Sequence, residues 1–322
     1  KTYDMAAPEV VCVYITGKPR PGVGPQDVAI ALVKNTFYAG VVKNRILEFV
    51  GPGVKYMSVD YRFGIDVMTT ETACLSSVWE TDELVEKWLT AHGRKQDYAK
   101  LQPEEGAYYD RLIHIDMDKV EPMIALPFHP GNAVTIREFK ANMEKYVDAI
   151  MVDAEKKIGK AAKNTDLRSK IRDGKFYVDQ AVVAGCSGGT FETLYRCHQI
   201  MQGKPIGDSA FEMSFYASSE PVYFELEKAG IPANLVRTGA TFRTSFCGPC
   251  FGAGDTPCQN GFSIRHTTRN FPNREGSKPT NGQLSFVALM DARSIAATAL
   301  NGGVLTGADE LPNPPAEVPV EY

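Results

Sequence analysis

The sequence predicts an α/β protein built from two layered α/β domains, each with a largely parallel sheet. Short apolar runs typical of buried strands alternate along the chain with segments of helical spacing. This alternation is the pattern of βαβ units, in which helices cover a parallel sheet. The 322 residues suffice for two such domains, each with its own core. We expect a first domain at residues 1–130 and a second at 131–322.

In the first domain, apolar runs and turn residues mark the successive elements. The run at 10–15 predicts a buried strand, which ends at Gly17 before a loop rich in glycine and proline. Further strands are expected at 46–50 and 72–78, and helices at 26–38, 58–70 and 82–92. Residues 108–130 contain Pro122, Pro127 and Pro130, so we expect an irregular connector there.

The second domain begins with an amphipathic segment that predicts one long helix over 135–162. Further strands are expected at 176–184, 212–217, 241–245, 263–267 and 284–289, and helices at 190–201, 220–229 and 291–300. Residues 312–316, Pro-Asn-Pro-Pro-Ala, have the composition of a linker and predict a further domain downstream.

Composition limits the function classes. The chain is 43% hydrophobic and 23% charged, as ordinary soluble proteins are. Its formal net charge is −4 and no basic stripe carries interleaved aromatics, so we expect no nucleic-acid partner. No apolar run has the length of a membrane span, and we expect a cytoplasmic protein without a membrane partner. Seven widely spread cysteines favour reduced thiols over a disulfide framework.

The most informative segment is Phe-Cys-Gly-Pro-Cys-Phe-Gly, in which Cys247 and Cys250 flank Gly-Pro. Cys186, in Gly-Cys-Ser-Gly-Gly, and Cys247 each follow a predicted strand. Ligands in open α/β sheets lie beyond the carboxyl ends of the strands, so we expect both motifs on one rim. Three soft ligands, followed in the chain by Arg269 and Arg274, indicate an iron–sulfur site that handles an acidic substrate.

Two other uses of these thiols stay open at this point. Cys-Gly-Pro-Cys is also the spacing of dithiol redox proteins, although the glycines and the proline that follow disfavour the long helix such a pair opens. A zinc site would use Cys250, Cys258 and further ligands, with His266 available. Burial as free thiols in a core suits three other cysteines: Cys12, Cys74 and Cys197.

Four segments together resemble the aconitase family of iron–sulfur hydro-lyases, which includes isopropylmalate dehydratase and homoaconitase. They are Gly-Cys-Ser-Gly at 185–188, Cys-Gly-Pro-Cys-Phe-Gly at 247–252, Arg-Asn-Phe-Pro-Asn-Arg at 269–274, and Thr-Thr-Glu-Thr-Ala at 69–73 after a Gly-Pro-Gly loop at 51–53. Weaker similarity at 11–17, 109–130 and 308–312 agrees in order and spacing, so the resemblance extends over most of the chain.

The resemblance implies a [4Fe-4S] cluster held by three thiolates, those of Cys186, Cys247 and Cys250. Three thiolates leave one iron without a protein ligand, which is the open position that a Lewis-acid catalyst needs. The resemblance also implies that Glu71 exchanges protons or hydrogen bonds with water at that iron. It gives Arg269 and Arg274 the role of binding substrate carboxylates, which the guanidinium fork matches.

The chain departs from the family pattern at three places. Ser187-Gly188-Gly189 replaces the usual Thr-Asn-Ser, and Thr268 and Val67 stand where asparagines are common. Amides near a cluster set its hydrogen bonding and the fit of the substrate. We therefore expect a divergent aconitase-like hydratase that acts on a hydroxy di- or tricarboxylic acid other than citrate.

The resemblance covers only the second and third of the family's four domains. In the family the first domain supplies histidine and aspartate acid–base groups, and the fourth supplies a serine base and a further arginine. Elimination of water needs a base and an acid. We therefore expect a central fragment that is inactive alone and whose partners are the missing first and fourth domains. An aconitase-like binding or regulatory module without catalysis stays open as an alternative.

Overall fold

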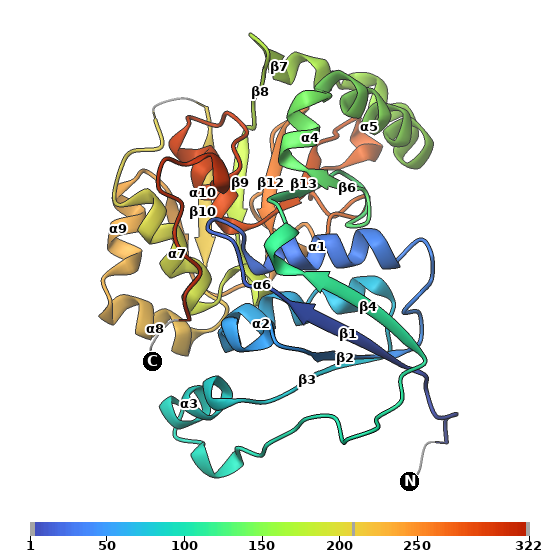
Figure 1. Ribbon diagram of the computed structural model, residues 1–322. Helices are drawn as coiled ribbons and strands as arrows, with labels where there is room; N and C mark the ends of the chain where they lie inside the picture. The colour runs from blue at the N-terminus through green and yellow to red at the C-terminus, as the bar shows by residue number, and fades with distance from the viewer. Residues whose placement is uncertain (1–3, 208–209, 320–322) are drawn as a thin grey trace.

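The computed structural model describes residues 4–207 and 210–319 and arranges them around two large sheets (Figure 1). A two-stranded antiparallel sheet of β7 (Ile171–Arg172) and β8 (Lys175–Phe176) lies apart from them. In the first sheet the strand order is β3-β2-β1-β4 and every pairing is parallel. Its strands are β1 (Val10–Thr16), β2 (Ile46–Val50), β3 (Ser76–Trp79) and β4 (Arg111–Asp116).

The second sheet has the order β11-β10-β9-β12-β13-β5-β6. Its strands are β5 (Met123–Ala125), β6 (Ala133–Thr135), β9 (Gln180–Val183), β10 (Glu212–Tyr216), β11 (Thr241–Arg243), β12 (Phe262–His266) and β13 (Phe286–Met290). The pairings among β9 to β13 are parallel, and those of β5 and β6 are antiparallel. The prediction of an α/β fold with largely parallel sheets is confirmed.

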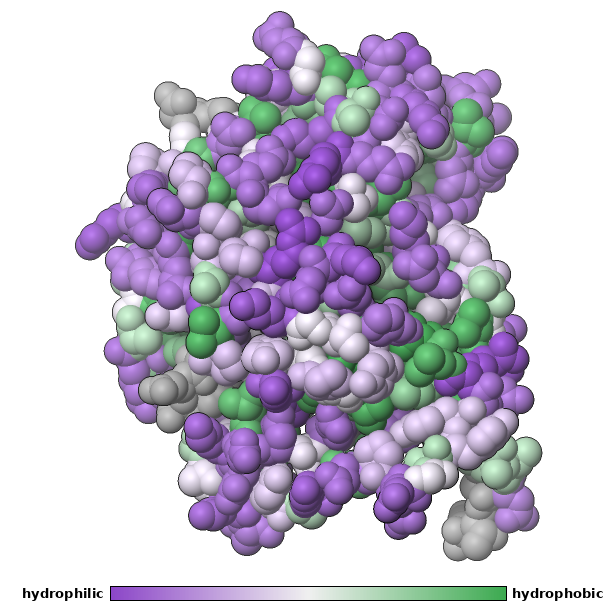
Figure 2. Space-filling view, viewed as in Figure 1, coloured by the Kyte–Doolittle hydropathy of each residue, from purple (hydrophilic) through white to green (hydrophobic). Residues whose placement is uncertain are grey.

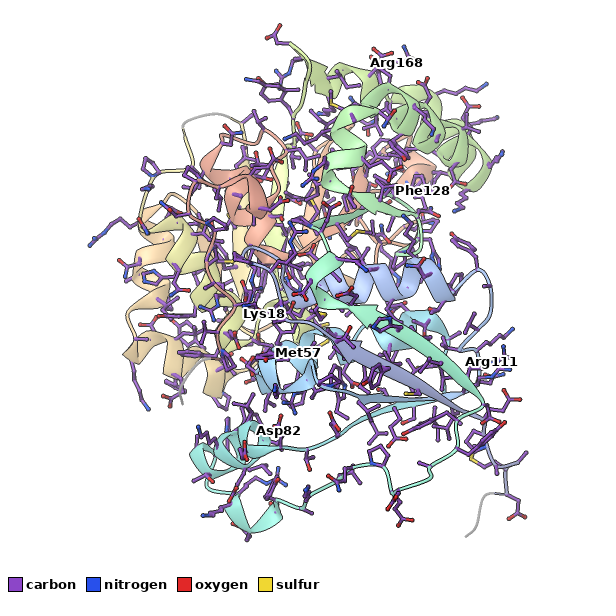
Figure 3. The ribbon with its side chains drawn as sticks, viewed as in Figure 1. Lys18, Met57, Asp82, Arg111, Phe128 and Arg168 are labelled. Carbon is purple, nitrogen blue, oxygen red and sulfur yellow. The ribbon has the colours of Figure 1, made fainter. Side chains whose placement is uncertain are left out.

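Helices connect the strands and cover the sheets. They are α1 (Pro25–Thr36), α2 (Val59–Asp66), α3 (Glu83–Ala91), α4 (Ile136–Ala141), α5 (Met143–Ile158), α6 (Gly185–Gly188), α7 (Phe191–Met201), α8 (Glu220–Lys228), α9 (Ile231–Arg237) and α10 (Ala292–Leu300). Local sequence explains their starts: the Asp82 carboxylate, for example, accepts hydrogen bonds from the backbone N–H groups of Leu84 and Val85 and so caps α3 (Figure 3).

Two expectations were wrong. The connector expected at 108–130 contains β4 and β5, because its prolines lie outside these strands, where no ladder hydrogen bond is lost. The long helix expected at 135–162 is two helices, α4 and α5, which meet at Asn142 with φ −136° and ψ 37°. Sheet membership changes between β4 and β5, before the expected domain boundary, because β5 already pairs with β13.

Helix α1 lies between the two sheets (Figure 1). Val28 and Leu32 on one side belong to the core of the first sheet. Ala29, Ile30 and Val33 on the other side pack with residues of β5, β6 and β13. The helix therefore joins the halves that carry the two parts of the candidate site described below.

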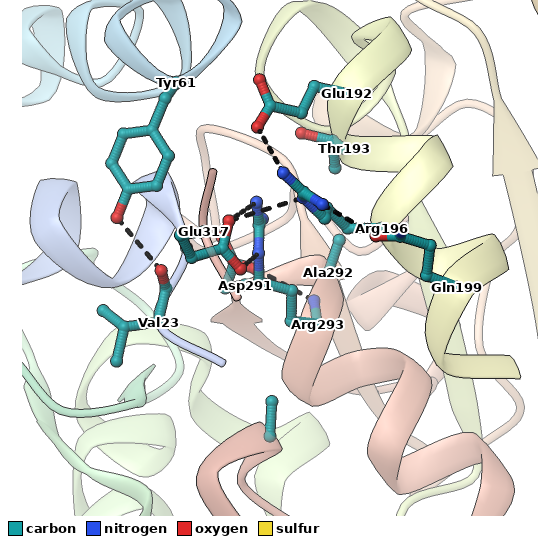
Figure 4. A network of polar contacts seen from close by, with 12 residues as sticks. Val23, Tyr61, Glu192, Thr193, Arg196, Gln199, Asp291, Ala292, Arg293 and Glu317 are labelled. Carbon is teal, nitrogen blue, oxygen red and sulfur yellow. Dashed lines mark hydrogen bonds and ion pairs between the residues drawn. The ribbon is translucent and has the colours of Figure 1, made fainter. Parts of the chain in front are cut away.

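Directly after the predicted linker at 312–316, the chain is held by a buried ionic network around Glu317 (Figure 4). The Glu317 carboxylate accepts two hydrogen bonds of 2.6 Å from Arg293 and lies 3.6 Å from Arg196. Arg293 also donates to Asp291 at 3.1 Å. The side chains of Arg293 and Glu317 are each 1% exposed, so this contact is part of the core.

Figure 2 shows hydrophilic side chains over most of one face, including the end formed by α5. There Arg168 makes an exposed, two-pronged ion pair with Asp148, at 2.7 and 2.6 Å (Figure 3). In the part of the chain that the structure describes, every helix is too short or too polar to cross a lipid bilayer.

Candidate metal and substrate site

The first thiol motif follows directly on β9. The chain turns at Gly185, whose φ of +75° favours glycine, and Cys186 is the second residue of the short helix α6 that begins there. A Cβ atom at Gly185 would lie 3.0 Å from the Cys250 Sγ atom. The missing side chain thus lets the backbone of the first motif approach the second motif closely.

The second thiol motif follows β11 and forms a 3₁₀ turn at Gly248–Cys250. The backbone N–H of Cys250 donates to the carbonyl of Cys247 at 3.2 Å, which closes the turn. Cys250 is buried, whereas Cys186 and Cys247 are exposed, and all three are free thiols. The structure therefore brings both motifs to one rim of the second sheet, at the carboxyl ends of β9 and β11.

The thiols are close enough to affect one another's ionisation. Burial, together with the charge of Cys247, raises the pKa of Cys250 to about 12. Although Cys186 is exposed as a residue, surrounding protein atoms partly desolvate its thiol, and this effect, together with the charge of Cys247, raises its pKa, while the Arg269 guanidinium lowers it. Backbone N–H groups favour both thiolates, that of Thr268 at Cys250 and that of Ser187 at Cys186. Raised pKa values mean that a metal entering this site displaces protons.

Glu71 reaches the site from the first sheet. It lies in the 3₁₀ turn Thr69–Thr72 after α2, and its side chain is 5% exposed. Its Oε1 atom is 2.8 Å from Nε of Arg269. Burial raises the pKa of Glu71, and the nearby charges of Arg269 and Arg274 oppose this shift. Arg269 thus lies near both the carboxylate and the Cys186 thiol, and it links the two halves of the site.

The loop that carries both arginines is anchored by Asn270, which sequence reasoning did not single out. Its buried amide donates to the carbonyls of Ala125, Leu126 and Val287, at 3.2, 2.8 and 3.3 Å. Its place directly after Arg269, in the Arg-Asn-Phe motif, was the sequence signal that could have identified it. Both arginine side chains remain partly exposed, with 40% exposure for Arg269, whose Nε is bound by Glu71.

The loop with the arginines also touches the thiol loop. A Cβ atom at Gly252 would meet the backbone of Gly276 at 2.8 Å and that of Arg274 at 3.2 Å. The six residues expected at the site, Glu71, Cys186, Cys247, Cys250, Arg269 and Arg274, therefore lie in one region, where Glu71 contacts Arg269 and the others influence one another through their charges.

The zinc ligands considered from the sequence are not assembled. Cys258 precedes β12, whereas His266 ends this strand, so the two lie at its opposite ends. His266 is fully buried, and its Nδ1 atom accepts a hydrogen bond from the backbone of Ala292 at 3.0 Å. Within residues 4–207 and 210–319, no three His, Cys, Asp or Glu side chains converge on one metal ion. A four-iron cluster does not need such convergence on one ion, because each thiolate binds a separate iron.

Fold and site together define an α/β protein in which thiols and two arginines at one rim of the second sheet meet a buried carboxylate from the first sheet. A family model described as the aconitase family (aconitate hydratase) matches residues 1–297. The chain therefore belongs to the aconitase family, as its motifs predicted.

Two curated relatives agree with this assignment. The chain is 24% identical to the 3-isopropylmalate dehydratase large subunit of Lachnoclostridium phytofermentans, over 89% of this chain and 60% of that protein. It is 27% identical to the 2,3-dimethylmalate dehydratase large subunit of Eubacterium barkeri, over 92% and 61%. A structure of Thermococcus kodakaraensis aconitase X aligns with TM-score 0.41 and 8% identity, over 91% and 55%. The chain spans about 60% of the length of the curated relatives it matches.

Proposed function

We propose that this chain is the central part of a hydro-lyase that reversibly dehydrates a hydroxy di- or tricarboxylic acid. The observation that carries the proposal is the position of Arg269, which pairs with the buried carboxylate of Glu71 and lies near the Cys186 thiol. An acid–base group and a carboxylate-binding group therefore stand beside a thiolate site. The dehydratase relatives support the same reaction class.

The residues present fit a [4Fe-4S] cluster. Three thiols reach one rim, Gly185 leaves room beside Cys250, and backbone N–H groups point at two of the sulfurs. When bound on Cys186, Cys247 and Cys250, such a cluster supplies a Lewis-acidic iron with an open coordination position.

The chain's own side chains supply binding and proton transfer. Arg274 and Arg269 would hold the substrate carboxylates, because the planar guanidinium matches a carboxylate with two hydrogen bonds. Burial raises the pKa of Glu71, so this carboxyl can carry a proton toward the departing hydroxyl group and take it back in hydration. The remaining acid–base groups and the partners of this chain would be the first and fourth domains of the whole protein, without which the chain is expected to be inactive.

Anaerobic reconstitution with iron and sulfide tests the proposed site directly. The wild-type chain is expected to bind about four irons and four sulfides and to turn brown. Single changes of Cys186, Cys247 or Cys250 to serine should each prevent stable assembly, because each removes one of three ligands. Cys258→Ser is the matched control, since this exposed thiol lies outside the group, and it should load like wild type. A zinc-loaded chain or a reversible Cys247–Cys250 disulfide in place of a cluster would refute the proposal.

Arg274→Lys in the full-length protein tests substrate binding and separates an enzyme from a non-catalytic module. Lysine keeps the charge but not the two-pronged geometry, so kcat/KM for dehydration should fall about 100-fold. The absorbance of the unsaturated product measures the rate. Lys278→Arg, at an exposed position a few residues downstream, should leave turnover unchanged. Equal rates for wild type and Arg274→Lys would show that Arg274 does not hold the substrate.

A further inference from the structure

Strand β12 carries a fully buried arginine, Arg265, at 0% exposure. Its guanidinium donates to the carbonyl of Pro249 at 2.8 Å and to that of Asp255 at 2.7 Å. It also donates to Ser263 Oγ at 3.1 Å and to Gln180 Oε1 at 3.3 Å. All four acceptors are uncharged.

The positive charge of Arg265 has no carboxylate partner within ion-pair distance among the described residues. Two carboxylates act on Arg265 at longer range, those of Asp255 and the buried Glu275. Asp255 is also bound by Arg243 at 3.1 Å and by the hydroxyl of Tyr216. Burial lowers the pKa of Arg265 to about 10, which still leaves the group protonated at neutral pH. A buried charge without an ion-pair partner at contact distance is costly for a fold, so a further anion close to Arg265 would stabilise it.

Outside its own sheet, the hydrogen bonds that Arg265 makes to described residues all go to the backbone of the thiol loop and of the turn that follows it. Pro249 lies between Cys247 and Cys250, and Asp255 ends the glycine-rich turn that follows. The charge of Cys250 is also among those that act on the Arg265 guanidinium. The buried cation is therefore placed directly behind the proposed metal ligands.

We propose that Arg265 is a positioning residue of the thiol loop, and that its positive charge offsets the negative charge of the metal–thiolate group bound there. The inference rests on the proposed function. Three thiolates and the inorganic sulfides make such a group anionic. A nearby cation stabilises it and raises its reduction potential, because net charge and hydrogen bonding set the potentials of iron–sulfur clusters.

Two substitutions separate charge from geometry in the reconstituted chain. Arg265→Lys keeps the charge but loses part of the hydrogen bonding, so its reduction potential should stay near that of wild type. Arg265→Gln removes the charge, so its potential should become more negative, and a chelator should extract its iron about ten-fold faster. Arg243→Gln is the control: it removes a nearby but 47% exposed guanidinium that also contacts Asp255, and both readouts should stay unchanged.

The metal-free chain gives a second, independent readout. Arg265→Met removes the charge together with the donor of four hydrogen bonds, so the metal-free chain should still fold but melt at a lower temperature than wild type. A metal-free Arg265→Met chain that fails to fold would overturn the proposal, because the charge would then serve the fold itself. Equal potentials for the lysine and glutamine variants would overturn it as well.

The outcome for wild type separates this inference from the proposed function. A wild-type chain that assembles no cluster sinks both. If the wild-type chain assembles a cluster and the Arg265 variants have the same reduction potential and iron release, only the role of Arg265 is refuted.

Discussion

Replacing Arg293 by methionine is expected to lower the free energy of unfolding by about 3–5 kcal/mol. Arg293 lies between two buried carboxylates, those of Glu317 and Asp291, and its side chain is 1% exposed. Removing the guanidinium leaves both carboxylates without their main partner in a region that water does not reach. Urea unfolding of the isolated chain at neutral pH measures the loss.

Two further variants show whether the buried position causes this effect. Arg168→Met breaks the two-pronged pair with Asp148, which has the same geometry but is exposed, and it should have a much smaller effect. Adding Glu317→Leu to Arg293→Met should recover part of the loss, because one of the stranded carboxylates is then gone. Equal effects of the Arg168 and Arg293 substitutions would contradict the buried network.

When the pH is lowered from 7 to about 4, the free energy of unfolding of the wild-type chain should fall by about 3 kcal/mol more than that of His266→Asn. Burial lowers the pKa of His266 to about 4, although the Asp291 carboxylate opposes the shift. Between the unfolded value near 6.5 and this folded value, the unfolded chain binds a proton that the folded chain does not. Stability therefore falls as the pH falls through this window.

Asparagine at position 266 presents an oxygen that can accept the hydrogen bond from Ala292 in place of Nδ1. Buried carboxylates such as Glu192, whose pKa burial raises, shift stability in the opposite direction but do so in both proteins. The difference between the two urea titrations thus isolates His266. His114→Asn, at an exposed histidine, should follow wild type. Parallel pH profiles for wild type and His266→Asn would show that His266 is not the acid-sensitive group.

Much of the fold could be predicted from the sequence, because many strands and helices here are marked by apolar runs and by capping residues close to them in the chain. The apolar run predicted at 263–267 is β12 at Phe262–His266, and Asp82 begins a helix as its side chain predicts. The break at Asn142 carries no glycine or proline signal, and only packing against the second sheet shows it. The anchoring of Glu317 is a contact with a distant part of the chain, which composition cannot reveal.

The candidate site likewise has features that the sequence predicts and features that only the structure shows. Cysteine spacing and the arginine motif pointed to one rim, because parallel strands end on the same side of a sheet. The pairing of Glu71 with Arg269 joins residues from different sheets, so only the structure shows its length. Arg265 was missed because an arginine in a sequence is by default a surface residue.

The position of α1 has a mechanical consequence. Of its residues, only Lys34 and Asn35 are exposed, and apolar neighbours press on it from two sides. Such a helix can neither tilt nor slide without opening both cores at once. The distance between Glu71 and the thiol rim is thus fixed by the scaffold, so any opening of the site to admit substrate must come from segments other than these two layers.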